Sequence, residues 1–255
     1  MDKFKVRDTK MIGFFIKTVI FIILLSFFPA IALSDIVVYD IVSPVGKEVM
    51  LKSEVRGKLF KKGGEVVEFF INGKTIGKSL TGGDGFAFKE FVPVKRGRYR
   101  ISVKSVKDKG EGLLISISKG SYIVFIDAEN CLFVRFSGKL REKSEKIIRE
   151  IDKRFPVVLL KTSLMNIKTV KEWLKKNSLK DFPLISWDGG IVFSDFVEKG
   201  FKIKAVVGSS DVINSAKEYK PIAFSFYNTE DGVYVRNWED IRKKLIDGTK
   251  VKDSY

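Results

Sequence analysis

The hydrophobic positions of the chain repeat with two different periods, and the change falls near Gly120. From Ile36 to about Lys119, apolar and polar residues alternate, as in Tyr99–Val103, and no stretch has helical spacing. Alternation places every second side chain on the same face of a strand. About seven short segments of this kind, separated by Gly-rich turns, predict an antiparallel β-sandwich over residues 35–119.

The clearest turn signal in this part is Asn72-Gly73, which stands between two alternating runs and predicts a hairpin. Together with Thr81–Ala87 and Gly97–Ile101, the segment Val67–Gly73 resembles bacterial immunoglobulin-like domains. In that family these segments are a strand-and-hairpin, a tight turn, and the entry to the final strand. The resemblance implies a fold and no chemistry.

Beyond Gly120, continuous apolar runs alternate with segments of helical spacing. The predicted strands are Tyr122–Ile126, Val157–Leu160, Ile203–Val207 and Pro221–Phe226, and the predicted helices cover residues 139–155, 167–174, 212–219 and a segment capped by Asn237. A continuous apolar run is typical of a parallel strand that is buried on both faces. Strand–helix alternation predicts βαβ units in a three-layer α/β domain over residues 120–250.

The first 34 residues form a segment of their own. Basic residues precede an apolar run, Thr18–Leu33. The segment ends in Ala32-Leu33-Ser34 before Asp35, so that small residues stand at Ala32 and Ser34. This is the pattern of a secretory signal peptide. Alternatively, residues 11–33 remain as an uncleaved membrane anchor, because the run approaches the ~20 apolar residues that span a bilayer. Either outcome exports the rest of the chain, to the periplasm, the cell surface or the medium.

The composition excludes several classes of chemistry. The 255 residues include no His and one Cys, Cys131. The absence of His excludes Ser-His-Asp hydrolases and His-ligated metal sites, and a single Cys excludes internal disulfides and CxxC redox pairs. The 47 Lys and Arg residues outnumber the 31 Asp and Glu residues, but no basic run is interleaved with aromatics, so we find no strong nucleic-acid signal. Membrane contact is expected only through an uncleaved N-terminal segment.

Polar residues that can take part in catalysis or ligand binding follow the predicted parallel strands, at the sheet edge where ligands of such sheets bind. They are Asp127 and Glu129 after the first strand, Thr162 after the second, and Asp211 after the third, with Lys202 and Lys204 at the start of that third strand. A carboxylate can attack phosphorus, while a hydroxyl and an ammonium hold the phosphoryl oxygens. A Mg²⁺ ion between carboxylates would offset the charge. None of this requires His.

This order of residues resembles the haloacid dehalogenase (HAD) superfamily of phosphatases over about residues 122–246. Within the superfamily it is most similar to lipin-type phosphatidate phosphatase domains, through Val158–Ser163, Thr169–Leu174 and Lys202–Asp211. The resemblance implies a fold class, an N-terminal all-β immunoglobulin-like sandwich plus a C-terminal α/β three-layer Rossmann-like (HAD-like) domain. It also implies a phosphorylated small molecule or lipid as the substrate.

The same resemblance implies a role for each residue. Asp127 would be the nucleophile, Glu129 the general acid and Thr162 a phosphate ligand. Lys202, or alternatively Lys204, would neutralise the phosphoryl charge. The Mg²⁺ ligands would be Asp127, Glu129 and Asp211. For these roles, the five side chains must converge around one open pocket.

Two positions depart from the family pattern. Glu129 stands where the family has the second Asp of Asp-x-Asp-Gly-Thr, and Ser209 stands where its last motif has an acid. The longer Glu129 side chain places its carboxyl group differently from that of an Asp, and a displacement of about 1 Å can slow catalysis about a hundredfold. Two hypotheses follow: an exported, Mg²⁺-dependent phosphatase with an aspartyl nucleophile, or a catalytically degenerate HAD-like protein that serves as a binding or surface module. A third, adhesion to nucleic acid or anionic lipid through the basic surface, predicts steep salt dependence.

Overall fold

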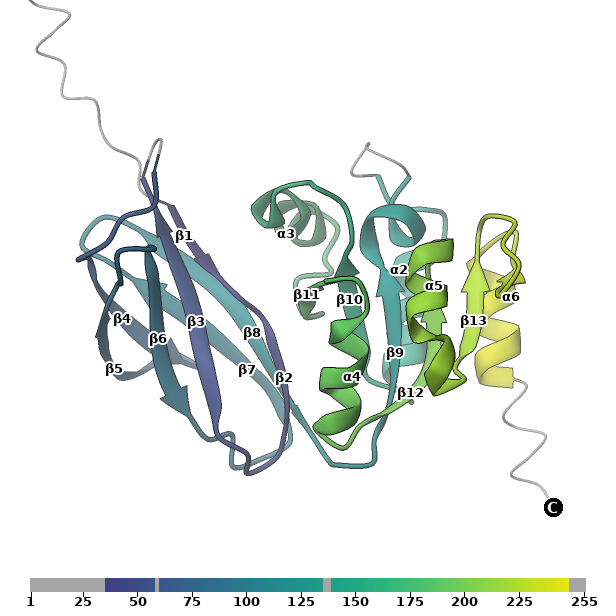
Figure 1. Cartoon of the computed structure of the whole chain (residues 1–255), viewed down its shortest axis with the longest axis horizontal. Helices are drawn as coiled ribbons and strands as arrows, with labels where there is room; N and C mark the ends of the chain where they lie inside the picture. Colours follow the sequence, from purple (N-terminus) through teal and green to yellow (C-terminus); the bar gives the residue numbers. More distant parts are fainter. Residues whose placement is uncertain (1–34, 58–59, 135–138, 248–255) are drawn as a thin grey trace, which may run out of the picture. The chain divides into compact units, whose positions relative to one another are not determined.

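The computed structural model describes residues 35–57, 60–134 and 139–247, which belong to one compact unit that begins at Ser34 (Figure 1). Their strands form three separate sheets, and the helices accompany the third. The predicted boundary at residue 119 falls between the last strand of the second sheet and the first strand of the third. The division into domains remains a prediction.

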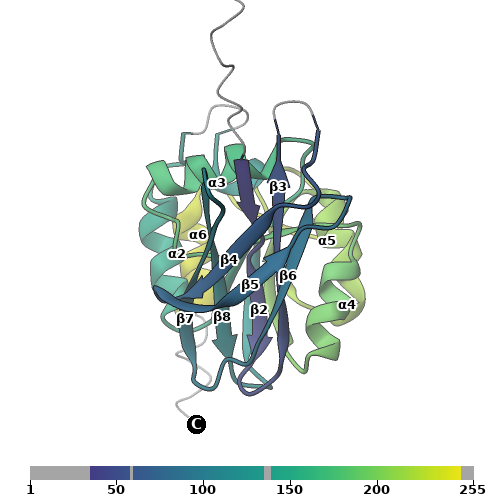
Figure 2. The same cartoon turned by 90° about the vertical axis from the view of Figure 1, so that its left-hand side faces the viewer.

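Two sheets make up the N-terminal sandwich (Figure 2). Its strands are β1 (Asp35–Val38), β2 (Ile41–Pro44), β3 (Val49–Arg56), β4 (Val66–Ile71), β5 (Lys74–Leu80), β6 (Phe86–Phe91), β7 (Gly97–Lys104) and β8 (Lys109–Ile117). One sheet has the order β1-β3-β6 and is antiparallel. The other has the order β2-β8-β7-β4-β5, in which only β2 and β8 run parallel among the described strands.

The predicted hairpin at Asn72-Gly73 is confirmed, because this turn joins β4 to β5. Asn72 has φ 50° and Gly73 has φ 83°. A two-residue hairpin turn of type I′ requires positive φ at both positions, which Asn and Gly adopt at the least cost. The Asn72 side-chain oxygen also accepts a hydrogen bond from the Arg100 backbone N–H at 2.8 Å. That bond holds the turn against β7.

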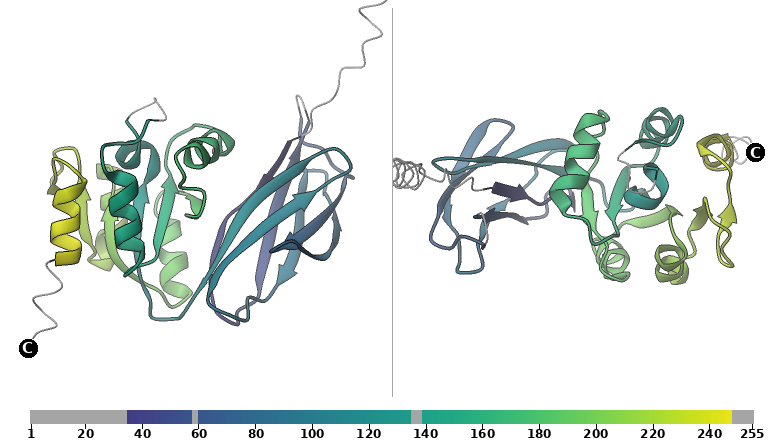
Figure 3. Two further views of the ribbon diagram at one scale, coloured as in Figure 1. Left: turned by 180° about the vertical axis from the view of Figure 1, so that it is seen from behind. Right: turned by 90° about the horizontal axis from the view of Figure 1, so that it is seen from above.

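The third sheet has the order β11-β10-β9-β12-β13-β14, and all its neighbouring strands are parallel. Its strands are β9 (Tyr122–Asp127), β10 (Val157–Lys161), β11 (Leu184–Ser186), β12 (Lys202–Val207), β13 (Ile222–Ser225) and β14 (Val233–Tyr234). The α-helices of this part are α2 (Ser144–Asp152), α3 (Ile167–Lys176), α4 (Ile191–Glu198), α5 (Ser210–Ala216) and, after the last strand, α6 (Trp238–Arg242). Figure 3 shows helices on both sides of the sheet.

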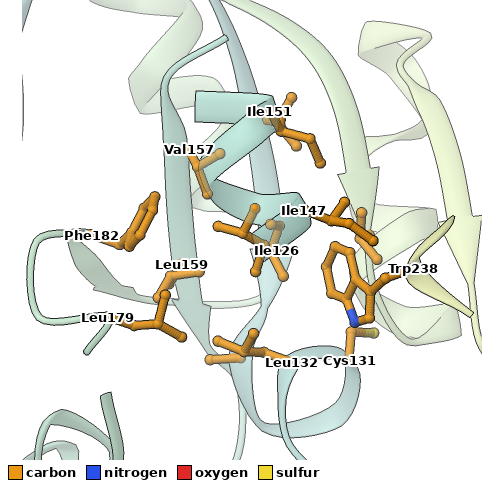
Figure 4. Packing of buried hydrophobic residues seen from close by; sticks show 14 of the residues in the cluster. Ile126, Cys131, Leu132, Ile147, Ile151, Val157, Leu159, Leu179, Phe182 and Trp238 are labelled. Atoms are coloured by element: carbon orange, nitrogen blue, oxygen red, sulfur yellow. The ribbon is translucent and has the colours of Figure 1, made fainter. Parts of the chain in front are cut away.

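Alternate residues of β9 enter two different apolar clusters. Ile126 packs in a cluster that includes α2, α3 and α6, with Trp238 and Cys131 close by (Figure 4). Phe125 packs in the other cluster, where its ring lies 5.1 Å from that of Phe193 and 5.0 Å from that of Phe196, both on α4. Burial on both faces explains why β9 has a continuous apolar sequence rather than an alternating one.

Most predicted elements of this part are present, with shifted ends. The helix predicted for residues 139–155 is α2, which begins at Ser144, and the caps at Asn166 and Asn237 accept hydrogen bonds from Lys168 N and Asp240 N. The prediction missed β11, α4 and β14. The missed helix α4 has the sequence IVFSDFVE, which is apolar on most of its surface and therefore lacks a clear amphipathic period.

The predicted Rossmann-like (HAD-like) class of residues 120–250 needs correction. The described chain is mostly β, with 25% of it helical, and its α-helices are short. Strand–helix alternation reports local periodicity and parallel pairing, which many folds share. It therefore predicted elements correctly and a superfamily incorrectly.

Strands of the sandwich contribute side chains both to the sandwich core and to the two apolar clusters around the third sheet. On β1, Ile36 and Val38 pack in the sandwich core, whereas Val37 packs with residues of α2 and α3. On β8, Leu114 belongs to the sandwich core and Ile115 to the cluster around α4 and α5. Strands of the sandwich therefore bury both faces.

Asp40 fixes the junction by hydrogen bonds. Its side chain, 5% exposed, accepts bonds from Leu113 N at 2.9 Å, from Leu184 N at 2.8 Å, and from the Lys171 ammonium at 2.7 Å. Lys171 also donates to the Val38 carbonyl at 2.7 Å. One carboxylate thus ties the β1–β2 connection to β8, to β11 and to α3. A buried charge with three donors is stabilising as long as all of them remain in place.

We expect Asp40→Asn to lower the free energy of unfolding by about 3 kcal/mol, since it leaves the Lys171 ammonium without its counter-charge and sets an N–H₂ group against backbone donors. Asp231→Asn is the matched control, because it removes an Asp–Lys pair of similar length, 2.6 Å, from the surface. This control substitution should lower the free energy of unfolding by no more than about 1 kcal/mol. Urea unfolding of both variants is the measurement, and equal losses would contradict the role of Asp40.

Candidate functional site

Asp127 is the last residue of β9 and begins the π-helical turn Ala128–Leu132. One of its carboxylate oxygens accepts a hydrogen bond from Asn130 N at 3.1 Å, and the other accepts one from the Asn130 side-chain amide at 2.9 Å. Asp127 is therefore the N-cap of this turn. A short acidic side chain suits that position because it satisfies a backbone N–H that has no partner within the helix.

Thr162, the residue after β10, closes the other side of Asp127. Its hydroxyl lies 2.8 Å from Asp127 Oδ1 and 3.2 Å from Glu129 Oε2. A hydroxyl carries a single hydrogen, and the shorter distance assigns its donation to Asp127. The three strand-end residues Asp127, Glu129 and Thr162 do converge, as the sequence predicted.

Glu129 is bound by the loop that follows β10. The backbone N–H of Thr162 donates to Oε2 at 2.7 Å, and the hydroxyl of Ser163 donates to Oε1 at 2.8 Å. Asn130 and Ser163, to which the sequence analysis gave no site role, thus complete a network of two carboxylates surrounded by donors. The sequence signal for them was their place beside Glu129 and Thr162.

The two carboxylates of this network are buried, while Asn130, Thr162 and Ser163 are partly exposed. Asp127 is 0% exposed and Glu129 is 5% exposed. Burial raises the pKa of Asp127, and the neighbouring Glu129 charge adds to this increase, while the hydrogen bonds from Asn130 and Thr162 oppose it. Neither of the two described cavities is lined by Asp127, Glu129 or Thr162. A nucleophilic carboxylate needs access to its substrate, and Asp127 has none here.

The same geometry does not fit the predicted Mg²⁺ ion. Magnesium binds carboxylate oxygens directly and keeps several waters in an octahedron. The carboxylate oxygens of Asp127 and Glu129 instead accept hydrogen bonds from protein donors. Among the residues that the structure describes, no group of three or more Asp, Glu or Cys side chains is placed to hold a metal.

The remaining two predicted residues do not join the network. Lys202 is the first residue of β12 and pairs with Tyr122, at the opposite end of β9 from Asp127, about 16 Å away along the strand. Its ammonium lies over the Tyr122 ring at 5.3 Å, as that of Lys204 does at 5.7 Å. Asp211 lies at the correct edge of the sheet, in the first turn of α5, but is exposed. The catalytic roles of these residues stay predictions that the geometry does not favour.

No family model matches the chain, and no curated protein matches it. Solved structures match about a third of it. The CARDB domain of a Pyrococcus furiosus protein is 15% identical, with 33% of this chain and 94% of that chain covered and a TM-score of 0.27. The D00-D0 domain of intimin is 17% identical over 33% of this chain and 46% of its own, with a TM-score of 0.29. Domains 4 and 5 of the S-layer protein SbsC are 14% identical over 33% and 51%, with a TM-score of 0.24.

These neighbours are of the immunoglobulin-like type, which agrees with the immunoglobulin-like character predicted for the N-terminal segment. At such identities and TM-scores, the comparisons transfer no function to this chain. Within the described residues, no helix is both long and apolar enough to cross a bilayer. The predicted signal or anchor, residues 1–34, lies outside the described residues.

The predicted HAD membership, with its similarity to lipin-type phosphatidate phosphatases, is wrong, since the neighbours are immunoglobulin-like domains and include no phosphatase. The predicted phosphatase activity, hydrolase class and magnesium requirement are corrected with it. The physical reason lies in the motif. An acid after a strand also serves as a cap, as Asp127 does, and a serine is also common at the position just before a helix, where Ser209 stands at α5.

Asp127 should make stability depend on pH in a recognisable way. Because its pKa is raised in the folded state, the folded protein holds this proton more tightly than the unfolded chain. The contribution of Asp127 to stability is then complete below its unfolded pKa and is lost as the pH rises through its folded pKa. Relative to Asp127→Asn, the wild type should therefore lose stability over a pH window that begins at about pH 4, the ordinary pKa of Asp, and extends upward.

The measurement is urea unfolding of wild type and Asp127→Asn at several pH values in that window. Asp211→Asn, which removes an exposed carboxylate at the same sheet edge, is the control. A difference between wild type and Asp127→Asn that stays constant with pH would contradict the effect of burial on Asp127.

Proposed function

We propose that this protein is an exported, non-catalytic binding module. The observation that carries the proposal is the closed network around Asp127 and Glu129, whose carboxylates cap a turn and anchor the loop after β10. A group held in this way stabilises structure and is inaccessible to a phosphate ester. The position of Lys202 at the far end of the strand supports the same conclusion.

The basic balance of the chain supports an anionic partner. With 47 basic against 31 acidic side chains, the protein attracts anions at long range. The partner that we propose is a phosphorylated small molecule or lipid, held as a ligand and not hydrolysed. Mg²⁺ has no part in this proposal.

We expect no Mg²⁺-dependent phosphate release from a panel of phosphomonoesters, either by the wild type or by Asp127→Asn, because substrate cannot reach the buried carboxylate. Phosphate is measured over hours with and without Mg²⁺, and an authentic phosphatase serves as the positive control. Release by the wild type that Asp127→Asn abolishes would overturn the proposal.

For the location, we propose that the signal segment is removed and that the mature chain begins at Asp35. Small residues at Ala32 and Ser34 fit signal peptidase, and β1 begins at Asp35. Asp35 also pairs with Lys168 on α3 at 3.2 Å.

The mass and N-terminal sequence of the protein from the exporting cell test this proposal. We expect an N-terminus at Asp35, and Ala32→Gln with Ser34→Gln should block cleavage, since signal peptidase requires small side chains. A mature wild-type protein that retains residues 11–33 would instead establish the anchor.

A further inference from the structure

The largest described cavity lies away from the carboxylate network, between one face of the sandwich and α3. Its volume is about 850 Å³. Arg98 and Arg100 on β7 form one wall together with Lys109 on β8. Lys175 on α3 and Lys180 in the loop before β11 form the other. Because Arg98 and Arg100 are two positions apart on a strand, their side chains leave the same face of the sheet.

The lining of this cavity, which we call the basic cleft, carries a surplus of positive charge. Six cationic side chains, Arg98, Arg100, Lys109, Lys171, Lys175 and Lys180, face three acidic ones, Asp40, Glu111 and Asp181. Lys171 is bound to Asp40, Lys109 to Glu111 at 2.6 Å, and Arg98 to Asp152 outside the lining. Arg100, Lys175 and Lys180 have no side-chain partner among the described residues and are exposed.

The electrostatic effect of the two unpaired lysines reaches across the basic cleft. The pKa of Glu111 is lowered, first by its hydrogen bond to Lys109 and also by the charges of Lys175 and Lys180. Those lysines come from a different element than Glu111, which lies on β8. Cations from both walls therefore act on the same space, where they favour an anion.

The unpaired groups are suited to oxyanions in particular. The Arg100 guanidinium presents parallel N–H groups that match two oxygens of a phosphate or carboxylate, and the lysines add point charges. Asn72, at the turn beside them, uses its side-chain oxygen to accept from Arg100 N, which leaves its N–H₂ group as a donor. Several cations on opposite walls fit several anionic groups on one ligand better than a single ion.

The volume of the basic cleft and the aromatic content of its lining narrow the range of ligands further. A volume of about 850 Å³ lies in the range of small-molecule sites. The only aromatic residue of the described lining is Phe182, which is 3% exposed and offers no free ring face. Binding of single-stranded nucleic acid relies on such faces for stacking. The basic cleft therefore favours a small ligand over a nucleic acid.

We propose that the basic cleft is the ligand site of this module and that it binds a small molecule, or a lipid headgroup, with two or more phosphate or carboxylate groups. This inference rests on the proposed binding function and assigns it a place. The Lys171–Asp40 pair forms part of the cleft wall and keeps α3 at its position against β8.

The test uses isothermal titration of the full mature protein with inorganic tripolyphosphate, citrate and orthophosphate at fixed moderate salt. We expect tripolyphosphate or citrate to bind at least about tenfold more tightly than orthophosphate, since each further ion pair adds affinity. The variant Arg100→Gln, Lys175→Gln, Lys180→Gln should lose this binding by a factor of ten or more. These residues are exposed, and circular dichroism with thermal unfolding verifies that the variant is folded.

A second triple variant, Lys78→Gln, Lys146→Gln, Lys244→Gln, is the matched control. It removes the same net charge from exposed lysines that do not line the basic cleft, and it should bind as the wild type does. Equal losses in both triple variants would reduce the effect to net charge and overturn the site. No binding of either multivalent probe, or equal affinity for orthophosphate, would overturn it as well.

Vesicles of phosphatidylcholine with and without cardiolipin, a lipid whose headgroup carries two phosphates, distinguish the source of the ligand. Binding only to cardiolipin vesicles, displaced by tripolyphosphate and lost in the cleft variant, assigns a lipid headgroup. Binding of the soluble probes without vesicle binding assigns a soluble ligand. Phosphate release that depends on Asp127 would overturn the non-catalytic function while leaving binding at the basic cleft intact, so the two failures are distinguishable.

Discussion

The structure depends on one buried carboxylate. The Asp40 side chain is only 5% exposed and therefore needs all its partners, Leu113 N, Leu184 N and the Lys171 ammonium, to be in place together. These partners come from a sandwich strand, a strand of the parallel sheet and a helix. Asp40 consequently specifies one arrangement of β8, β11 and α3, and the wall of the basic cleft follows from that arrangement. Apolar packing across β1 and β8 supplies the bulk of the stabilisation, while Asp40 selects the geometry.

The burial of carboxylates must be compensated at two places in the protein, at Asp40 and at the Asp127–Glu129 network. Asp40 balances its burial with an ammonium and two backbone donors, whereas Asp127 and Glu129 balance theirs with hydroxyls, an amide and backbone N–H groups alone. Burial without a cation raises the pKa of Asp127, and repulsion by the neighbouring Glu129 charge adds to this increase. An acid-x-acid sequence after a buried strand is thus compatible with a capping network as well as with catalysis. Only the hydrogen-bond donors around the two acids distinguish the capping role from the catalytic one.

Local features of the fold were predictable from the sequence and distant ones were not. The Asn72-Gly73 turn, the continuous apolar run of β9 and the Asn237 cap depend on residues a few positions apart, so their patterns are visible in the chain. The convergence of Asp127 with Thr162 followed from parallel strand order alone. The closure of that site did not, because it depends on the rotamers of Asn130 and Ser163. The basic cleft was missed for a related reason: Arg100 and Lys175 lie 75 positions apart, and each alone resembles an ordinary surface cation.

Burial of both faces of β1 and β8 has a consequence for the order in which the chain can fold. The residues that cover Val37 and Ile115 follow the N-terminal strands in the chain, and the N–H of Leu184 lies 144 positions after Asp40. A sandwich that formed before them would expose apolar patches and an unsatisfied carboxylate. The sandwich therefore reaches its final packing only once most of the chain is available, and until then its exposed apolar surface favours aggregation.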